Sequence, residues 1–351
     1  MKKILLMLLG LLLLSALGGG GFYYLYNRRL TAFAEAPYGQ DSTRVVDIPQ
    51  GTGPRKLANL LEEAGVISSA ESFYGYLRRE KLGPRLKAGE YEFKGPRTPL
   101  EIIGKLVAGE VKVYRFTVRE GLRVDETLPI LASSELRLDL STLEKLVRTN
   151  AFVRQLGVPA DSIEGFLYPD TYAFTRGTTE EQVLRRMVSR ALEEYQKASR
   201  AAPAEHPLTL LETMTLASIV EKETGAPQER PRISCVFHNR LKQGMRLQTD
   251  PTVLYAMMLS RGRFIKNISR ADLQTDHPYN TYTRHGLPPG PIASPGAAAM
   301  VAAFNPIACL DLFFVSRNDG THLFCPDLKC HEAAVRTWQV EFFRKKRVRR
   351  N

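Results

Sequence analysis

The strongest pattern of apolar positions lies at the start of the chain, where an uncharged run extends from Ile4 to Tyr26. About 20 apolar residues are enough to cross the hydrocarbon core of a membrane as a helix. Lys2 and Lys3 precede the run, aromatic residues crowd its end, and Arg28 and Arg29 follow it. Aromatic residues and a basic pair are typical of the interfacial edge of a span. The pattern therefore predicts one transmembrane helix.

The alternative for this segment is a cleaved signal peptide. Its apolar core would be residues 4–14, followed by the small residues of 15–21. The aromatic residues and the arginine pair favour a retained span. The flanking charges do not settle the orientation, because each flank carries two basic side chains. If the N-terminus stays in the cytoplasm, either interpretation places the rest of the chain outside it.

After a polar linker, the apolar pattern predicts five elements in the order β-α-α-β-α. They lie at about 45–48, 56–64, 70–79, 86–93 and 98–108, the last beginning at the capping residue Thr98. The opening motif, Ile48–Gly51 before a Leu-rich helix, recurs at Val118–Gly121. The first copy resembles a LysM-type module, a small fold that grips N-acetylglucosamine polymers. A purely structural spacer is the alternative.

The segment 140–205 is predicted to be mainly helical, with an aromatic-rich interruption at Glu164–Phe174. A helix at Leu208–Thr224 follows, and it is apolar over most of its surface, as buried helices are. Glu221 extends an apolar stripe at helical spacing from Met214 and Ala217. A carboxylic acid against an apolar wall resists ionisation, which suits a general acid.

The same pattern does not single out Glu221, because Glu223 lies near another apolar face of that helix. The simpler interpretation is that one or both carboxylates pair with arginines such as Arg230, Arg232 or Arg240. Both interpretations stay open on the pattern alone.

Further along, polar and aromatic residues surround turns. Gln248 and Asp250 precede Pro251, where a helix is predicted to begin, and Asp250 could be its N-terminal cap. Tyr279–Tyr282 and the loop Gly286–Gly296 follow, and the loop is expected to be rigid because it holds four prolines and three glycines. Rigid loops flanked by aromatic residues often line sugar sites, although they also occur as packing elements.

Composition narrows the class of protein. The chain has 351 residues, of which 44% are hydrophobic and 25% charged, as in globular proteins of two or three domains. The net charge is +12, but six of the last eight residues are basic, so the body is only mildly basic. No nucleic-acid-binding motif accompanies this charge, and we expect a solvated tail or contact with anionic lipid.

The cysteines are Cys235, Cys309, Cys325 and Cys330, and His322 and His331 flank the last pair. Zinc is conceivable but the spacing matches no common zinc class, so a Cys325–Cys330 disulfide or plain thiols are preferred. The phosphate-loop, zinc-protease and serine-hydrolase motifs are absent.

Five motifs together resemble the YceG-like family of endolytic murein transglycosylases, in order and spacing. They are Glu164–Tyr172, Ala217–Thr224, Asn239–Val253, Tyr279–Tyr282 and Gly286–Gly296. The resemblance covers about residues 1–340. It implies cleavage of nascent peptidoglycan strands between N-acetylmuramic acid and N-acetylglucosamine, leaving 1,6-anhydro ends. The family's catalytic glutamate falls on Glu221.

The resemblance implies that one acid suffices, without a second carboxylate, a metal or a cofactor. Glu221 would protonate the leaving oxygen and then accept the proton of the sugar's own 6-hydroxyl. The candidates for orienting the glycan are Gln248, Asp250, Asn280, Tyr282 and Glu164. An ordinary muramidase using Glu223 or Asp250, and a non-enzymatic peptidoglycan-binding protein, are the alternatives.

The predicted architecture is of the α+β class: a transmembrane helix, a small LysM-like module and a larger mixed α/β catalytic domain. The boundaries are a cytoplasmic N-terminus at 1–3, the span at 4–26, a linker at 27–44, the LysM-like module at 45–115, the YceG-like catalytic domain at 116–340 and a basic tail at 341–351. New glycan emerges at the outer face of the bacterial inner membrane, so we expect a single-pass protein with its catalytic domain on that side. Penicillin-binding proteins are the expected partners, and nucleic acid is not.

Overall fold

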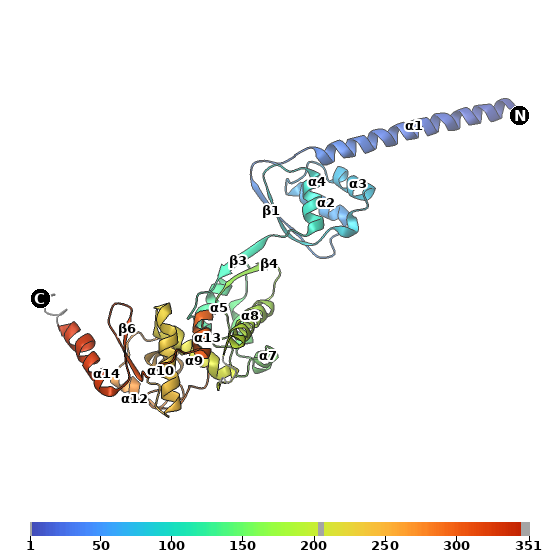
Figure 1. Cartoon of the computed structure of the whole chain (residues 1–351). Coiled ribbons are helices and arrows are strands. Elements are labelled where there is room, and N and C mark those ends of the chain that lie inside the picture. Colours follow the sequence, from blue (N-terminus) through green and yellow to red (C-terminus); the bar gives the residue numbers. More distant parts are fainter. Residues whose placement is uncertain (1, 203–206, 345–351) are drawn as a thin grey trace. The chain divides into compact units, whose positions relative to one another are not determined.

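The computed structural model describes residues 2–202 and 207–344 of the chain (Figure 1). The described part divides into two compact units. Unit 1 is Met1–Tyr114 with Ala173–Gly177, and unit 2 is Arg115–Tyr172 with Thr178–Asn351. Most of the basic tail predicted at 341–351 lies outside the described residues, as do residues 203–206.

Unit 1 contains the predicted β-α-α-β-α order behind one long helix. Its elements are α1 (Lys2–Glu35), β1 (Thr43–Ile48), α2 (Pro54–Glu63), α3 (Ala70–Arg79), the short η1 (Gly83–Arg85), β2 (Gly89–Lys94) and α4 (Pro99–Ala108). β1 and β2 pair antiparallel, with Val46 opposite Tyr91. The side chains that face the helices from these strands, including Ile48 and Tyr91, are buried with Leu57, Phe73 and Leu106 in one core.

Local signals set the ends of these helices. Ser69 caps α3 by accepting a hydrogen bond from the N–H of Ser72. Thr98 and Glu101 form a capping box at the start of α4, and Gly109 ends that helix in the left-handed conformation. Thr98 therefore caps its helix as predicted.

The helix α1 differs from the predicted arrangement of span and linker. It passes the expected end of the span and continues to Glu35, through the first part of the predicted linker. The reason is packing: Leu30 and Ala34 are buried, and Phe33 packs against the core of unit 1. α1 contacts α3 and α4 along this stretch. Its first part, from Leu6, is long and apolar enough to cross a membrane.

Unit 2 is mostly helical. β3 (Val113–Thr117) and β4 (Thr171–Thr175) form a two-stranded sheet. The chain passes from one unit to the other within each of these strands, after Tyr114 and after Tyr172. The remaining elements are α5 (Val124–Ala132), α6 (Leu140–Val147), α7 (Asn150–Gln155), α8 (Glu180–Arg200), α9 (Leu210–Glu223), η2 (Pro227–Glu229), α10 (Arg230–Lys242), α11 (Asp250–Arg261), α12 (Arg270–Gln274), α13 (Ala297–Phe304), β5 (Phe313–Ser316), β6 (His322–Cys325), α14 (Leu328–Val335) and the π-helix η3 (Arg336–Glu341).

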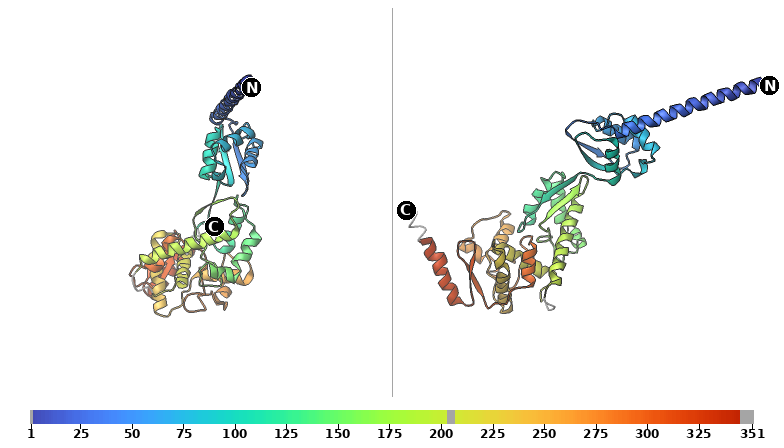
Figure 2. Two further views of the ribbon diagram at one scale, coloured as in Figure 1. Left: turned by 90° about the vertical axis from the view of Figure 1, so that its right-hand side faces the viewer. Right: turned by 45° about the horizontal axis from the view of Figure 1, so that its top comes forward.

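The centre of unit 2 is α9, which packs against α10, α11 and α13. Two further views of the ribbon show that helices make up most of this unit (Figure 2). α13 also lies against α8. At the edge of the unit, β5 and β6 pair antiparallel and α14 covers them. The segment 286–296 forms no helix or strand, as predicted for a loop rich in proline and glycine.

Candidate active site

The floor of the candidate site is the C-terminal end of α9. Thr209 and Glu212 form a capping box at the start of this helix, and every residue from Thr213 to Val220 is buried. A helix that is buried all round can present charged side chains to an open site only where it ends. Glu221 and Glu223 occupy this last turn, and the side chain of Glu221 is only 6% exposed.

Glu221 is held by two donors. The Arg230 guanidinium lies 2.8 Å from its Oε1, and the backbone N–H of Gly296 donates to its Oε2 at 3.1 Å. Arg230 is the first residue of α10 and is itself buried. The expectation that a carboxylate of α9 pairs with an arginine is therefore confirmed for Glu221. Both donors stabilise the ionised form of this carboxylate.

A second carboxylate, Glu120, approaches the same arginine. Its Oε2 lies 3.7 Å from the Arg230 nitrogen that binds Glu221, so the two carboxylates share one cation. Burial and, after it, the negative charge of Glu221 raise the pKa of Glu120, while Arg230 opposes the shift. Two carboxylates around one guanidinium hold a proton more readily than either would alone.

The loop 286–296 is tied to this floor. The N–H of Ile292 donates to Ser218 on α9 at 3.0 Å. Ser294 exchanges backbone hydrogen bonds with the turn that follows Glu120: its carbonyl accepts from the N–H of Gly121, and its N–H donates to the carbonyl of Leu122. The motif Val118–Gly121 and the loop motif are thereby brought to the end of α9.

Two glycines lie where other residues approach their backbone closely. A Cβ at Gly296 would lie 2.0 Å from a carboxylate oxygen of Glu120, so any larger residue would displace Glu120. Gly165 has a φ of +82°, and a Cβ there would lie 2.3 Å from the Cβ of Pro291. Only glycine adopts this conformation without cost and leaves room for the proline. The glycines of these two motifs thus set the distance between the loop and its neighbours.

Glu223 belongs to a separate cluster on the other side of the helix end. It accepts a hydrogen bond from Thr249. Burial raises the pKa of Glu223 to about 7, and the nearby charge of Asp250 adds to this effect. Asp250 accepts a hydrogen bond from the hydroxyl of Tyr282 at 2.6 Å. Asp250, at the end of the Gln248–Asp250 turn, and Tyr282 are thus in direct contact.

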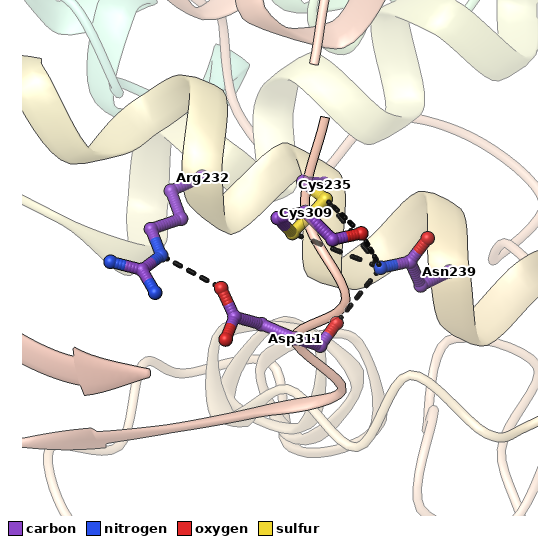
Figure 3. Close-up of a disulfide and its surroundings, with 5 residues drawn as sticks. All are labelled: Arg232, Cys235, Asn239, Cys309 and Asp311. Carbon is purple, nitrogen blue, oxygen red and sulfur yellow. Dashed lines mark hydrogen bonds and ion pairs between the residues drawn. A yellow bond between two sulfur atoms is a disulfide. The ribbon is translucent and has the colours of Figure 1, made fainter. Parts of the chain in front are cut away.

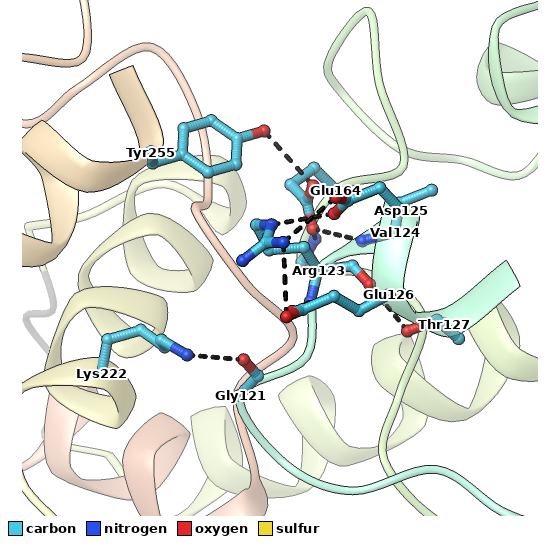
Figure 4. A network of polar contacts seen from close by, with 10 residues as sticks. Gly121, Arg123, Val124, Asp125, Glu126, Thr127, Glu164, Lys222 and Tyr255 are labelled. Atoms are coloured by element: carbon cyan, nitrogen blue, oxygen red, sulfur yellow. Dashed lines mark hydrogen bonds and ion pairs between the residues drawn. The ribbon is translucent and has the colours of Figure 1, made fainter. Parts of the chain in front are cut away.

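Glu164 is the centre of a buried network (Figure 4). Its carboxylate accepts hydrogen bonds from the N–H of Val124 at 3.1 Å and from the hydroxyl of Tyr255 at 3.3 Å. Burial raises the pKa of Glu164 to about 7. In the same view, Lys222 donates to the carbonyl of Gly121 at 2.9 Å, which fixes the segment after Glu120 to α9. Glu164 also lines a cavity of about 410 Å³.

The remaining predicted residues play different parts. Gln248 is exposed, with a φ of +47°. Asn280 is fully buried, and its amide donates to the carbonyls of Asp272, Leu273 and Thr275. Asn280 therefore holds its loop together and does not face solvent. Asp250 is the first residue of α11 and not its cap, because Thr249 occupies the N-cap position.

The cysteines form two disulfides, Cys235–Cys309 and Cys325–Cys330. The second pairing agrees with the preferred interpretation, and the zinc alternative is wrong for these thiols because both are oxidised. Within residues 2–202 and 207–344, no group of three or more His, Cys, Asp or Glu side chains is arranged to hold a metal ion.

Sequence reasoning missed Glu120 as part of the site. The signal that could have found it was the repeated motif Val118–Gly121, which we interpreted only as a structural repeat. A glutamate directly before a turn glycine with a positive φ is common to Glu120–Gly121 and Glu164–Gly165, and both pairs pack against the loop 286–296.

Comparison with known proteins adds independent findings. The model of the YceG-like family matches residues 46–337. The chain is 30% identical over 318 residues to the endolytic murein transglycosylase of Bacillus subtilis, covering 85% of this chain and 86% of that one. It is 29% identical to the endolytic murein transglycosylase of Streptococcus pneumoniae, covering 83% of this chain. The match spans only 57% of that longer relative.

A solved structure is also similar. The crystal structure of a yceG-like protein from Listeria monocytogenes matches with a TM-score of 0.56 and 30% sequence identity. The match covers 83% of this chain and 98% of that one.

Proposed function

The chain belongs to the YceG-like family, and on that premise we propose that it is an endolytic murein transglycosylase, a lyase that cuts peptidoglycan strands within the chain. The observation that supports this best is the extent of the match, because the family model runs from residue 46 in unit 1 to residue 337 in unit 2 and includes all five motifs. The function then requires an acid close to a sugar-binding surface.

We assign the acid to Glu221. In the reaction we propose, its proton passes to the glycosidic oxygen as the bond from that oxygen to the anomeric carbon breaks. The resulting carboxylate accepts the proton of the muramic 6-hydroxyl, whose oxygen forms the new bond to the anomeric carbon. No water is consumed, and Glu221 ends protonated again. The attack is intramolecular, so positioning supplies much of the rate.

The neighbours of Glu221 support both halves of this cycle. Arg230 and the N–H of Gly296 stabilise the carboxylate once its proton has left. Glu120 supports the protonated state that precedes proton transfer. A second negative charge at the same guanidinium favours the retention of one proton by the two carboxyl groups. We propose that Glu120 and Glu221 share this proton before the substrate arrives.

The orienting residues are also proposals. Asp250 and Tyr282 form one hydrogen-bonded pair beside the exposed Gln248, and these three offer donors and acceptors to sugar hydroxyls. Glu164 acts indirectly, by holding the backbone of Val124 and Gly165. Glycan contact by the LysM-like module at 45–115 is a further proposal, supported by a cavity of about 560 Å³ between β2 and α4.

The test is the glutamine variant at Glu221, which keeps the size and shape of the side chain but cannot donate the proton. We expect Glu221→Gln to lower the rate of strand cleavage by about a hundredfold or more. Mass spectrometry of the products from uncrosslinked strands measures this rate and identifies the ends. Glu332→Gln, an exposed change on α14, is the matched control. Release of anhydro-ended products by the Glu221→Gln variant at the control rate would exclude this assignment.

An ordinary muramidase is the second candidate, because Glu120 offers the additional carboxylate that hydrolysis needs. Hydrolysis adds one water, so its products carry reducing ends and are heavier than anhydro products by that mass. In the lyase we expect Glu120→Gln to slow cleavage without changing the anhydro ends. Reducing ends from the unmodified protein would favour the muramidase.

The location follows as a proposal from the same function. We propose that α1 holds the catalytic unit at the outer face of the bacterial inner membrane, where new strands emerge. Penicillin-binding proteins are then the expected neighbours. A pull-down from solubilised membranes that recovers no glycan synthase would count against this partnership.

A further inference from the structure

Unit 1 contains a basic and aromatic cavity beside the end of the apolar run. Its volume is about 490 Å³. The residues that line it from α1 are Tyr23, Tyr26 and Asn27, and those from α2 and α3 include Arg55, Tyr74 and Arg78. Tyr26 is the last residue of the uncharged run, so the cavity lies at the level where the span meets the lipid headgroups.

The position of the cavity is fixed by close packing between α1 and α3. The guanidinium of Arg79 donates to the carbonyl of Asn27 at 2.9 Å and to the hydroxyl of Thr31 at 3.0 Å. A Cβ at Gly75 would lie 2.7 Å from the hydroxyl of Tyr26, so the glycine permits this approach. Leu30 is buried in the same contact, so the C-terminal part of α1 is packed into the folded body of unit 1.

Two guanidinium groups in the cavity have no carboxylate partner. Arg55 and Arg78 flank the ring of Tyr74, with guanidinium carbons 5.6 Å and 5.9 Å from its centroid. Neither forms an ion pair with any residue in the described part of the chain, and both are exposed. Glu71 is the one acidic residue of the lining, and Arg79, which also lines the cavity, is paired with Glu80 at 2.8 Å.

A second cavity, of about 510 Å³, adjoins the first. It shares Arg55, Tyr74 and Arg78, and it is otherwise lined by mainly apolar groups such as Pro54, Leu77 and Pro84. The arginine pair therefore has a site at the membrane level on one side and an apolar recess on the other. This combination suits an anion with an apolar or sugar-like body.

We propose that Arg55 and Arg78 form a binding site for the phosphate of an anionic membrane lipid. Guanidinium groups bind phosphate oxygens in a fork geometry, and basic side chains near a membrane surface are attracted to anionic lipids. The site lies where lipid phosphates are concentrated, because α1 delivers it there. A bound lipid would hold unit 1 against the membrane surface.

The test uses the full chain in nanodiscs of phosphatidylcholine with increasing phosphatidylglycerol. Native mass spectrometry of the released protein counts the lipids retained. We expect the unmodified chain to retain phosphatidylglycerol in preference to phosphatidylcholine. The double variant Arg55→Gln/Arg78→Gln should weaken this retention about tenfold or more. Arg44→Gln/Arg85→Gln removes the same charge from exposed positions of unit 1 and should retain the lipid.

Equal loss in both double variants would overturn the proposal, since it would show a general effect of charge. Equal retention in the unmodified chain and in Arg55→Gln/Arg78→Gln would also overturn it. Competition with inorganic phosphate distinguishes a lipid phosphate from a free phosphate ion as the ligand of this site. Displacement of the lipid by millimolar phosphate would assign the site to a free anion and overturn the lipid assignment. The readout involves no glycan, so it does not depend on the proposed transglycosylase activity.

Discussion

The buried carboxylates of unit 2 differ in the groups that contact each of them. Glu221 is paired with a guanidinium at 2.8 Å and accepts a backbone N–H. Glu164 and Glu223 instead accept hydrogen bonds from neutral groups, and burial raises the pKa of each to about 7. A strongly raised pKa alone would have pointed to these two residues, whereas the shared arginine and the loop N–H distinguish Glu221.

The buried Glu164 makes a testable contribution to stability. Its pKa is about 7 in the folded state and 4.5 in the unfolded chain, so the folded state binds this proton more tightly. Stability is then full below about pH 4.5 and falls as the pH rises through 7, by on the order of 3 kcal/mol. Glu164→Gln, which mimics the protonated acid, should remove this loss and be more stable than the unmodified protein at pH 8.

Urea unfolding at pH 5 and pH 8, followed by the fluorescence of the single tryptophan, Trp338 in unit 2, measures the effect. The exposed Glu332→Gln serves as control and should keep the original pH dependence. If the Glu164→Gln variant loses as much stability between pH 5 and pH 8 as the control does, the protonated carboxyl is not the cause.

Among the elements, α10 connects the candidate site with the C-terminal part of unit 2. Its first residue, Arg230, binds Glu221. One turn and more further on, Cys235 is bonded to Cys309, and Asn239 donates to the carbonyls of Cys309 and Asp311 at 3.1 Å and 3.0 Å (Figure 3). The same helix thus positions the arginine and anchors the chain that leads from α13 to β5.

The two disulfides should differ in their contribution because they close loops of different length. Cys235–Cys309 spans 74 residues and Cys325–Cys330 spans 5. Loop-closure entropy gives about 4 kcal/mol for the first and about 2 kcal/mol for the second. We expect Cys235→Ser/Cys309→Ser to lower the melting temperature more than Cys325→Ser/Cys330→Ser.

Calorimetry of both variants, with and without reductant, measures this difference. Reductant should lower the melting temperature of the unmodified protein toward that of the first variant. A larger loss from removing the short loop would contradict the entropic argument.

At the scale of the whole molecule, the apolar helix and unit 1 are continuous. α1 begins as a candidate membrane span and ends inside the core of unit 1, where Ala34 is fully buried. A flexible linker between the apolar helix and the body would let the body move freely. A continuous helix that packs against the core instead fixes unit 1 to that helix. Anchoring is therefore part of the fold of unit 1.

Orientation in the membrane is the prediction at this scale. If the function is as proposed, the body lies outside the cytoplasm, and protease added to intact spheroplasts should degrade everything after α1. A cytoplasmic marker protein must survive the same treatment. Protection of the body until the membrane is lysed would reverse the orientation and conflict with action on emerging strands.

Sequence alone determined the features that depend on neighbouring residues. The strand and helix order of unit 1, the cap at Thr98 and the buried character of α9 follow from apolar spacing and capping chemistry, which act within a few residues. The sequence motifs also identified the family, because all five family motifs occur in this chain in the expected order.

Tertiary structure decided what no local pattern contains. Phe33 and Ala34 look like part of a polar linker, but Ala34 is buried in unit 1 and Phe33 packs against its core. Asn280 looks like a ligand for sugar hydroxyls until its amide is seen to hold three carbonyls. Glu120 and Glu221 are about a hundred residues apart, and only the packing of α9, α10 and the loop 286–296 brings both to Arg230. Contacts between distant segments depend on how elements pack, and periodicity along the chain does not record them.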